Sequence, residues 1–243
     1  MRLPSCSATQ ILRRKFGVGS DARLIEKWVN FTTGIPDRTE VYRHKGINRV
    51  VKNYQVGIKD DDLLNFDGQF SLENGHKVIY IKSNLGEKRR RFTLAHELGH
   101  VAFYALAPEL NQNVTEVERL CDIFAAELMM PVRMVRKLAE AFRGPELVLT
   151  LAKMAGASLP AACIRVNECL GITSGLATLD GNVIENYGHL PDKLNPSGEL
   201  TARLRAAAEH DYCGPISVDD WQLDWSVSGN MRIYTVSPLP TAA

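Results

Sequence analysis

Residues 90–104, RRFTLAHELGHVAFY, place two histidines and a glutamate inside a stretch that is otherwise suited to burial. In an α-helix, residues four apart lie on one face a single turn apart, so His96 and His100 can grip one metal ion. Glu97, beside the first ligand, can act on a water at the metal as a general base without binding the metal itself. A buried helix with hydrogen-bonded histidines is the alternative, but the complete HExxH pattern on an apolar helix favours a metal site.

A third ligand must come from another segment, because a hydrolytic zinc site usually has three protein ligands and one open position. The next predicted helix, residues 115–130, carries four acidic residues. At about 100° per residue, Glu118 lies at the edge of the apolar arc with Asp122 one turn further along, whereas Glu116 and Glu127 fall on the polar side. We therefore expect Glu118 to be the third metal ligand and Asp122 to orient a ligand through a hydrogen bond.

Glu118 has a second interpretation, since Thr115 and Glu118 match the spacing of a capping box at a helix start. In that role Glu118 would leave the metal without its third ligand. A buried, charged glutamate beside two imidazoles is compensated when a cation lies between them. The ligand role is therefore the favoured one.

The rest of the chain predicts a mixture of helices and hairpins. Two β-prone runs between residues 62 and 83 surround Asn74-Gly75, a step that suits a tight hairpin turn. The strand within them, KVIYIKS, could offer a free edge to an extended peptide or lie inside a sheet, and both alternatives stay open. Further hairpins are expected in residues 176–186 and 221–236. Helices are expected over residues 7–16, 21–30, 88–106, 115–130, from Pro131 onwards, over 146–171 as a pair, and over 198–209.

The composition of the chain does not indicate a particular class of binding partner. The chain is 45% hydrophobic and 23% charged with a net charge of +1, as in an ordinary globular protein. The five cysteines are scattered without CxxC pairs, which predicts reduced, mostly buried thiols. No apolar run approaches the roughly 18 residues of a membrane-spanning helix. We therefore expect a cytoplasmic protein without a membrane partner.

The two motifs together resemble the ImmA/IrrE family of bacterial metallopeptidases. In this family HExxH precedes a helix of the pattern E-x-x-A/C-N/D-x-x-A-A-x-L-x-M-P, which residues 118–131 match. The resemblance implies a gluzincin-like enzyme with His96, His100 and Glu118 as metal ligands and Glu97 as the catalytic acid/base. Zinc is the default ion for a His/His/Glu donor set, with manganese or iron as alternatives. The resemblance further implies cleavage of a helix-turn-helix (Xre-type) repressor or antitoxin, which would derepress stress or mobile-element genes.

The expected fold class is α+β, in three parts. Residues 1–145 would form a mostly helical zincin-like metallopeptidase core with a small sheet, 146–171 a helix-turn-helix-like segment, and 172–243 a small α/β domain. Some family members carry a GAF-like sensory domain in the last position, although about 72 residues are short for a complete one. A donor to the oxyanion is also expected. The chemically able residues are Tyr80, Tyr104, Tyr187, His189 and Tyr212.

Two non-enzymatic functions compete with this interpretation. The first is a DNA-binding regulator that uses residues 146–171, but its would-be recognition helix has only Arg165 and Glu168 as charged residues, which suits a polyanion poorly. Direct DNA binding is therefore not expected. The second is a protein that sequesters a repressor without cutting it. The intact Glu97 counts against this function.

Overall fold

The structure is a computed structural model, and it describes residues 7–35, 45–108, 115–191, 194, 198–209, 215–218 and 220–239. Its helices are α1 (Ala8–Phe16), α2 (Asp21–Thr33), α3 (Lys45–Tyr54), α4 (Glu87–Leu106), α5 (Thr115–Met129), α6 (Val132–Ala141), α7 (Gly144–Ala155), α8 (Leu159–Leu170) and α9 (Glu199–Glu209). Its strands are β1 (Gly57–Asp61), β2 (Gly68–Glu73), β3 (His76–Lys82), β4 (Thr173–Thr178), β5 (Val183–Tyr187), β6 (Ile216–Val218), β7 (Trp221–Ser228) and β8 (Met231–Pro238). The predicted α+β class is confirmed.

The chain forms two compact units. The first comprises Met1–Met134 with Met154–Ala157, and the second comprises Val135–Lys153 with Ser158–Ala243. The sequence-based division into residues 1–145, 146–171 and 172–243 assigned a separate role to each part. That division stays a prediction.

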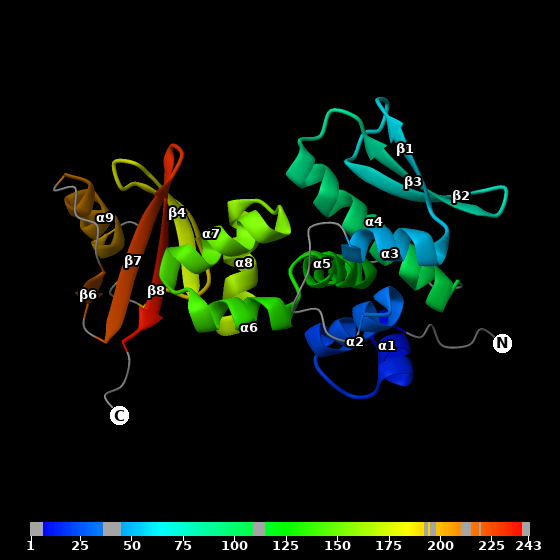
Figure 1. Cartoon of the computed structure of the whole chain (residues 1–243), viewed down its shortest axis with the longest axis horizontal. Coiled ribbons are helices and arrows are strands. Elements are labelled where there is room, and N and C mark those ends of the chain that lie inside the picture. The colour runs from blue at the N-terminus through cyan, green and yellow to red at the C-terminus, as the bar shows by residue number, and fades with distance from the viewer. Residues whose placement is uncertain are drawn as a thin grey trace. The chain divides into compact units, whose positions relative to one another are not determined.

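In the first unit, α4 lies between a three-stranded sheet and α5 (Figure 1). The sheet has the order β1-β3-β2, with β1 parallel and β2 antiparallel to β3. Behind α4 and α5, the indole of Trp28 on α2 packs edge-on against Phe103 and Phe124, with ring centroids 4.5 and 4.9 Å away. This aromatic cluster fixes α4 and α5 against a common support.

Local signals explain the element boundaries that were predicted well. Ser7 begins α1 with a complete capping box, and Ser20 accepts the Arg23 N–H at the start of α2. The β2–β3 hairpin turns at Asn74, with a φ of 50°, and Gly75, with a φ of 81°. A two-residue hairpin loop of this kind requires two consecutive residues in the left-handed region.

Three predictions about this unit need correction. KVIYIKS forms β3, which is the central strand, so the free-edge alternative for it is wrong. Glu127 was placed on the polar side of α5, yet it is 3% exposed and accepts the Val132 N–H at the start of α6. No element was expected at α3 or β1. β1 was missed because its five residues include one apolar side chain, Ile58.

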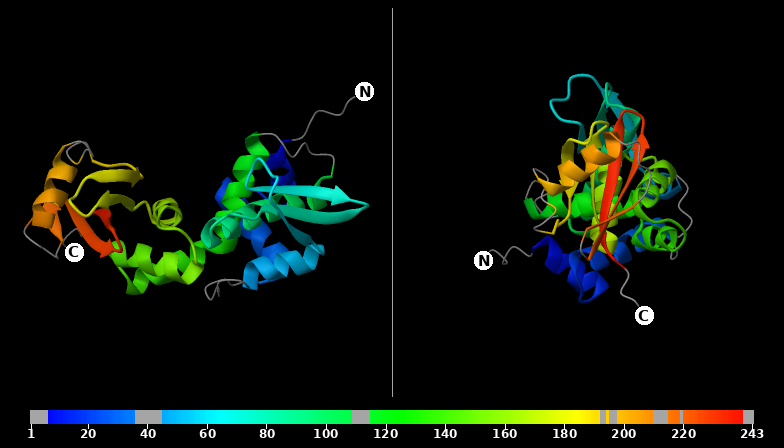
Figure 2. Two further views of the ribbon diagram at one scale, coloured as in Figure 1. Left: turned by 90° about the horizontal axis from the view of Figure 1, so that it is seen from above. Right: turned by 90° about the vertical axis from the view of Figure 1, so that its left-hand side faces the viewer.

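In the second unit, a five-stranded sheet has the order β5-β4-β8-β7-β6, with antiparallel pairs throughout. Helices α8 and α9 lie on opposite faces of it (Figure 1 and Figure 2), and β4 is accordingly buried on both sides. The core on the α9 face consists of Ala177, Leu194, Leu200, Leu204, Leu223, Tyr234 and Val236. Likeness of this part to a GAF domain stays a prediction.

The predicted helix pair of the helix-turn-helix-like segment is present as α7 and α8, which meet at 116°. Ala162, Cys163 and Val166 of α8 are buried. Arg165 is also buried, at 4% exposure, and pairs with Glu168 at 3.2 Å. Its guanidinium is therefore not presented to a nucleic acid.

Among the described residues, no single helix has the length and apolar character to cross a membrane, although the bent α7–α8 pair passes on length and composition together. Of the cysteines, Cys121 and Cys163 are buried and Cys169 is partly buried, all as free thiols. Cys6 and Cys213 lie outside the described residues.

Candidate metal centre

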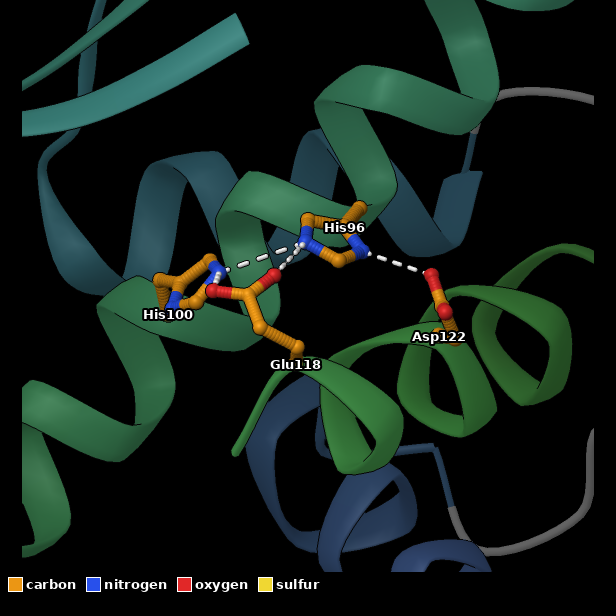
Figure 3. A network of polar contacts seen from close by, with 4 residues as sticks. All are labelled: His96, His100, Glu118 and Asp122. Carbon is orange, nitrogen blue, oxygen red and sulfur yellow. Dashed lines mark hydrogen bonds and ion pairs between the residues drawn. The ribbon is translucent and has the colours of Figure 1, made fainter. Parts of the chain in front are cut away.

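The four side chains singled out around the HExxH helix meet at one place (Figure 3). His96 and His100 project from one face of α4, and α5 brings Glu118 between them. The Nε2 atoms of the two imidazoles are 3.2 Å apart. The Glu118 carboxylate lies 3.2 Å from His96 Nε2 through Oε2 and 3.4 Å from His100 Nε2 through Oε1.

These spacings fit a tetrahedral metal site. Zinc bonds of about 2.0–2.1 Å at tetrahedral angles place neighbouring donor atoms roughly 3.3 Å from each other. One donor atom from each of His96, His100 and Glu118 lies within 4.8 Å of the other two. The Glu118 side chain is 46% exposed and not buried as expected from the sequence, which leaves one side of the group open. Two imidazoles and a carboxylate with an open side are the donor set of a catalytic rather than a structural zinc site.

Asp122 holds the first histidine from behind. Its Oδ1 lies 2.8 Å from His96 Nδ1, on the side of the ring away from Glu118 (Figure 3). Accepting the Nδ1 proton selects the tautomer whose Nε2 lone pair points toward His100 and Glu118. Burial lowers the pKa of His96, but the hydrogen bond to Asp122 and the nearby carboxylates outweigh burial, so the pKa is raised. The negative surroundings suit a cation.

Glu118 does not act as the glutamate of a capping box begun by Thr115. Thr115 is the first residue of the helix itself, and the Glu118 carboxylate contacts the two histidines. The neighbouring Glu116 caps a different helix: its carboxylate accepts the N–H groups of Ala8 and Thr9 at the start of α1, at 2.9 and 3.2 Å.

Glu97 is 7% exposed and stands beside the three donors rather than among them. Burial raises its pKa to about 7, opposed by the charge of His96 and by a hydrogen bond from the Phe70 N–H on β2, and assisted by the charge of Glu118. A carboxylate with a pKa near 7 can take up and release a proton at neutral pH. Glu97 can therefore exchange a proton beside the three donors.

A cavity of about 880 Å³ opens over these residues. One wall is β2 with the segment before it, and another is the face of α4 that carries His96, Glu97 and His100. Tyr104, one turn after His100, lies in this lining and packs against Phe70 with ring centroids 5.7 Å apart. The aromatic and apolar lining residues are Phe66, Phe70, Leu72, Phe92 and Tyr104.

The structure separates the five candidate oxyanion donors. Tyr104 is the one that lines this cavity. The Tyr80 hydroxyl donates to Glu73. Tyr187 and His189 belong to the second unit, and Tyr212 lies outside the described residues.

Sequence reasoning missed the contribution of β2. The Phe70 N–H that reaches Glu97 and the close approach of Gly68 to α4 depend on how a strand packs on a helix. Neither leaves a signal in the local pattern of the sequence.

Comparison with known proteins places this region in a family. Residues 50–167 match the sequence model of peptidase family M78, described as the IrrE N-terminal-like domain. The chain is 35% identical over 115 residues to the radiation response metalloprotease IrrE of Deinococcus radiodurans, a match that covers 42% of this chain and 34% of that protein. It is 29% identical over 159 residues to the protein of the same name from Deinococcus deserti, covering 60% of this chain and 53% of that protein. The matches thus span between a third and about half of the relatives' length.

Among solved structures, a Mycobacterium tuberculosis transcriptional regulator is similar with a TM-score of 0.52 and 13% identity, covering 91% of this chain and 77% of that one. This likeness is one of fold. The match to the family model spans the HExxH helix and the helix that carries Glu118, the two motifs on which the ImmA/IrrE resemblance was based. That resemblance is confirmed for the matched region: residues 50–167 are a member of the IrrE N-terminal-like domain family.

Proposed function

We propose that the chain is a metal-dependent endopeptidase that hydrolyses a peptide bond in a specific protein. Zinc is the default ion and manganese the alternative, and the fold of the first unit is of the zincin, gluzincin-like kind. The observation that carries the proposal is that the Nε2 atoms of His96 and His100 lie 3.2 Å apart, each 3.2–3.4 Å from one of the two Glu118 carboxylate oxygens, beside the buried carboxylate of Glu97. The metalloprotease names of both curated relatives support it.

Each residue has a distinct role in the proposed reaction. His96, His100 and Glu118 would hold the metal, and Asp122 would keep His96 in the required tautomer. A divalent ion in such a site lowers the pKa of water and polarises a carbonyl oxygen. Glu97 takes a proton from the attacking water and delivers it to the leaving amine. Tyr104 is the candidate donor to the oxyanion, because it lines the cavity from the turn of α4 after His100.

An extended substrate can pair with β2. Within the part of the chain that the structure describes, β2 pairs with β3 on one side and with no strand on the other. It also lines the cavity along Gly68–Leu72. Backbone hydrogen bonds to a strand edge bind peptides with little dependence on their sequence, so the apolar lining would add side-chain preference. Such a substrate must be unfolded or looped where it is cut.

We further propose a helix-turn-helix (Xre-type) repressor or antitoxin as the substrate, so that cleavage derepresses stress or mobile-element genes in the cytoplasm. Family membership and the radiation response named for both relatives support this choice. The DNA-binding alternative loses support because Arg165 is buried and paired.

The test is cleavage of a defined substrate. The full chain, loaded with zinc, is incubated with a helix-turn-helix repressor encoded beside it, and intact masses are measured. Two fragments whose masses sum to the repressor plus one water are expected, and a chelator or Glu97→Gln abolishes them. Glu87→Gln, the same change at an 83% exposed side chain of the same helix, keeps wild-type cleavage. Tight association with an unchanged mass would instead indicate sequestration.

A further inference from the structure

Strand β2 passes close to the HExxH helix at its first residue. Gly68, the first residue of β2, faces Thr93 and Glu97, which lie one turn apart on α4. A Cβ at position 68 would lie 2.5 Å from Thr93 Cγ2, a separation that real Cβ atoms do not adopt. It would also lie 3.1 Å from Glu97 Cγ and 3.2 Å from Glu97 Oε1. The space beside the carboxylate is therefore available only because residue 68 has no side chain.

The close approach has a consequence two residues further along the strand. Phe70 donates its N–H to the Glu97 carboxylate, so β2 has to lie near α4 for this bond to form. Backbone donors on a strand are more rigid than side-chain donors, since the strand is held by its ladder to β3 from Gly68 to Glu73. Glu97 thus contacts a fixed donor, the Phe70 N–H, and lies next to Gly68, which has no side chain.

We propose that Gly68 is a positioning residue for the general base: it lets β2 approach α4 closely enough for the Phe70 N–H to hold the Glu97 carboxylate in its reactive place. This inference rests on the proposed function, in which Glu97 moves the protons. The three atoms nearest to a Cβ at position 68 belong to Thr93 and Glu97 and not to a metal donor. The role of Gly68 therefore concerns the base and not the metal.

The chain offers a set of matched variants. Gly68→Ala adds one methyl group that collides with Thr93 and Glu97, and Thr93→Ser removes the Cγ2 atom at 2.5 Å while it keeps the hydroxyl. The double variant should relieve the worst collision. Gly57→Ala, on β1 of the same sheet, is the control, because its Cβ would meet neighbours at 3.8 and 3.9 Å, an ordinary contact distance.

The experiment combines kinetics, metal affinity and NMR on the full chain. In Gly68→Ala we expect kcat for repressor cleavage to fall by about 10- to 100-fold, a part of the roughly 10²–10⁴-fold that general acid/base catalysis supplies. KM and zinc affinity, measured by chelator competition, should stay within about twofold, since the metal donors are untouched. Gly68→Ala with Thr93→Ser should recover part of the loss, and Gly57→Ala should resemble the wild type.

The NMR readout does not depend on catalysis. In metal-free wild-type protein the Phe70 amide proton should resonate downfield, as expected of a bond to a carboxylate, and it should shift upfield in Gly68→Ala and return partly in the double variant. If no substrate is cleaved by the wild type, the proposed function fails while this readout still judges the role of Gly68. If Gly68→Ala does not fold, the double variant is compared with Thr93→Ser, from which it differs by the same methyl group.

Retention of both wild-type kcat and the wild-type Phe70 resonance in Gly68→Ala would overturn the inference. So would a fall in zinc affinity that matches the fall in kcat, because Gly68 would then act on the metal donors.

Discussion

Gly99 on α4 packs directly against Cys121 on α5. A Cβ at position 99 would lie 3.1 Å from the Cys121 Sγ and 3.2 Å from its Cα, so the two helices meet there almost backbone to backbone. Gly99 lies between His96 and His100, and Cys121 lies between Glu118 and Asp122. The contact therefore sets the distance at which α5 presents its two carboxylates to the two histidines.

Replacing Gly99 with alanine should push α5 away from α4. We expect the free energy of unfolding to fall by about 1–3 kcal/mol, as for other overpacked sites, and zinc affinity to fall about tenfold or more because the ligands leave their productive geometry. Chemical denaturation and chelator competition measure the two effects. Gly86→Ala, where an added Cβ meets nothing within 4 Å, is the control. Unchanged zinc affinity in Gly99→Ala would show that the helix separation does not govern the site.

Asp122→Ala should weaken zinc binding without unfolding the chain. Loss of a carboxylate that orients a ligating histidine typically costs 10- to 100-fold in metal affinity. Asp122→Asn should lose less, because its amide oxygen can still accept the His96 Nδ1 proton. Competition with a chelator of known affinity measures the order of the three proteins. An alanine variant that binds zinc as tightly as the wild type would remove Asp122 from the site.

Glu116 is only two residues from Glu118, but its substitution should affect stability and not zinc binding. Its carboxylate accepts two N–H groups at the start of α1, where a negative charge is favoured. Glu116→Ala should therefore lower the free energy of unfolding by about 1 kcal/mol. Zinc affinity should remain at the wild-type value. Impaired zinc binding in this variant would mean that Glu116 contributes to the metal site.

Arg91 holds the turn after α7 through a buried guanidinium. It donates to the carbonyl oxygens of Ala155 and Gly156, at 3.2 and 3.1 Å, and to Glu87. A Cβ at Gly156 would lie 1.7 Å from the Arg91 Nη1, at a φ of 61°. Gly156→Ala should displace the guanidinium and leave buried polar groups without partners, at a cost of about 1–3 kcal/mol beyond that of the backbone strain.

Gly171→Ala measures the cost of backbone strain alone and is the control for Gly156→Ala. Gly171 has a similar φ of 70° with nothing within 4 Å of an added Cβ, so its substitution carries the strain without the collision. Denaturant unfolding of both variants measures the difference. Equal losses of stability would show that the Arg91 contact contributes nothing.

The sequence predicted the parts of the site that depend on one helix at a time. The spacing of His96 and His100 and the place of Glu118 on its apolar arc follow from 3.6 residues per turn. The same geometry wrongly placed Glu127 on the polar side of α5. Its side chain is buried because it accepts the Val132 N–H at the start of α6. The order of the sheet was equally out of reach, since the parallel strand β1 that encloses β3 has almost no apolar pattern.

The central claim is that His96, His100 and Glu118 share one divalent ion. Crystals of the full chain grown with zinc and without chelator, with data collected on both sides of the zinc absorption edge, test it most directly. We predict one anomalous peak per chain about 2.0–2.2 Å from the Nε2 atoms of both histidines and from a Glu118 oxygen. An anomalous map without a peak between these residues, with Glu118 turned away from the histidines, would contradict it.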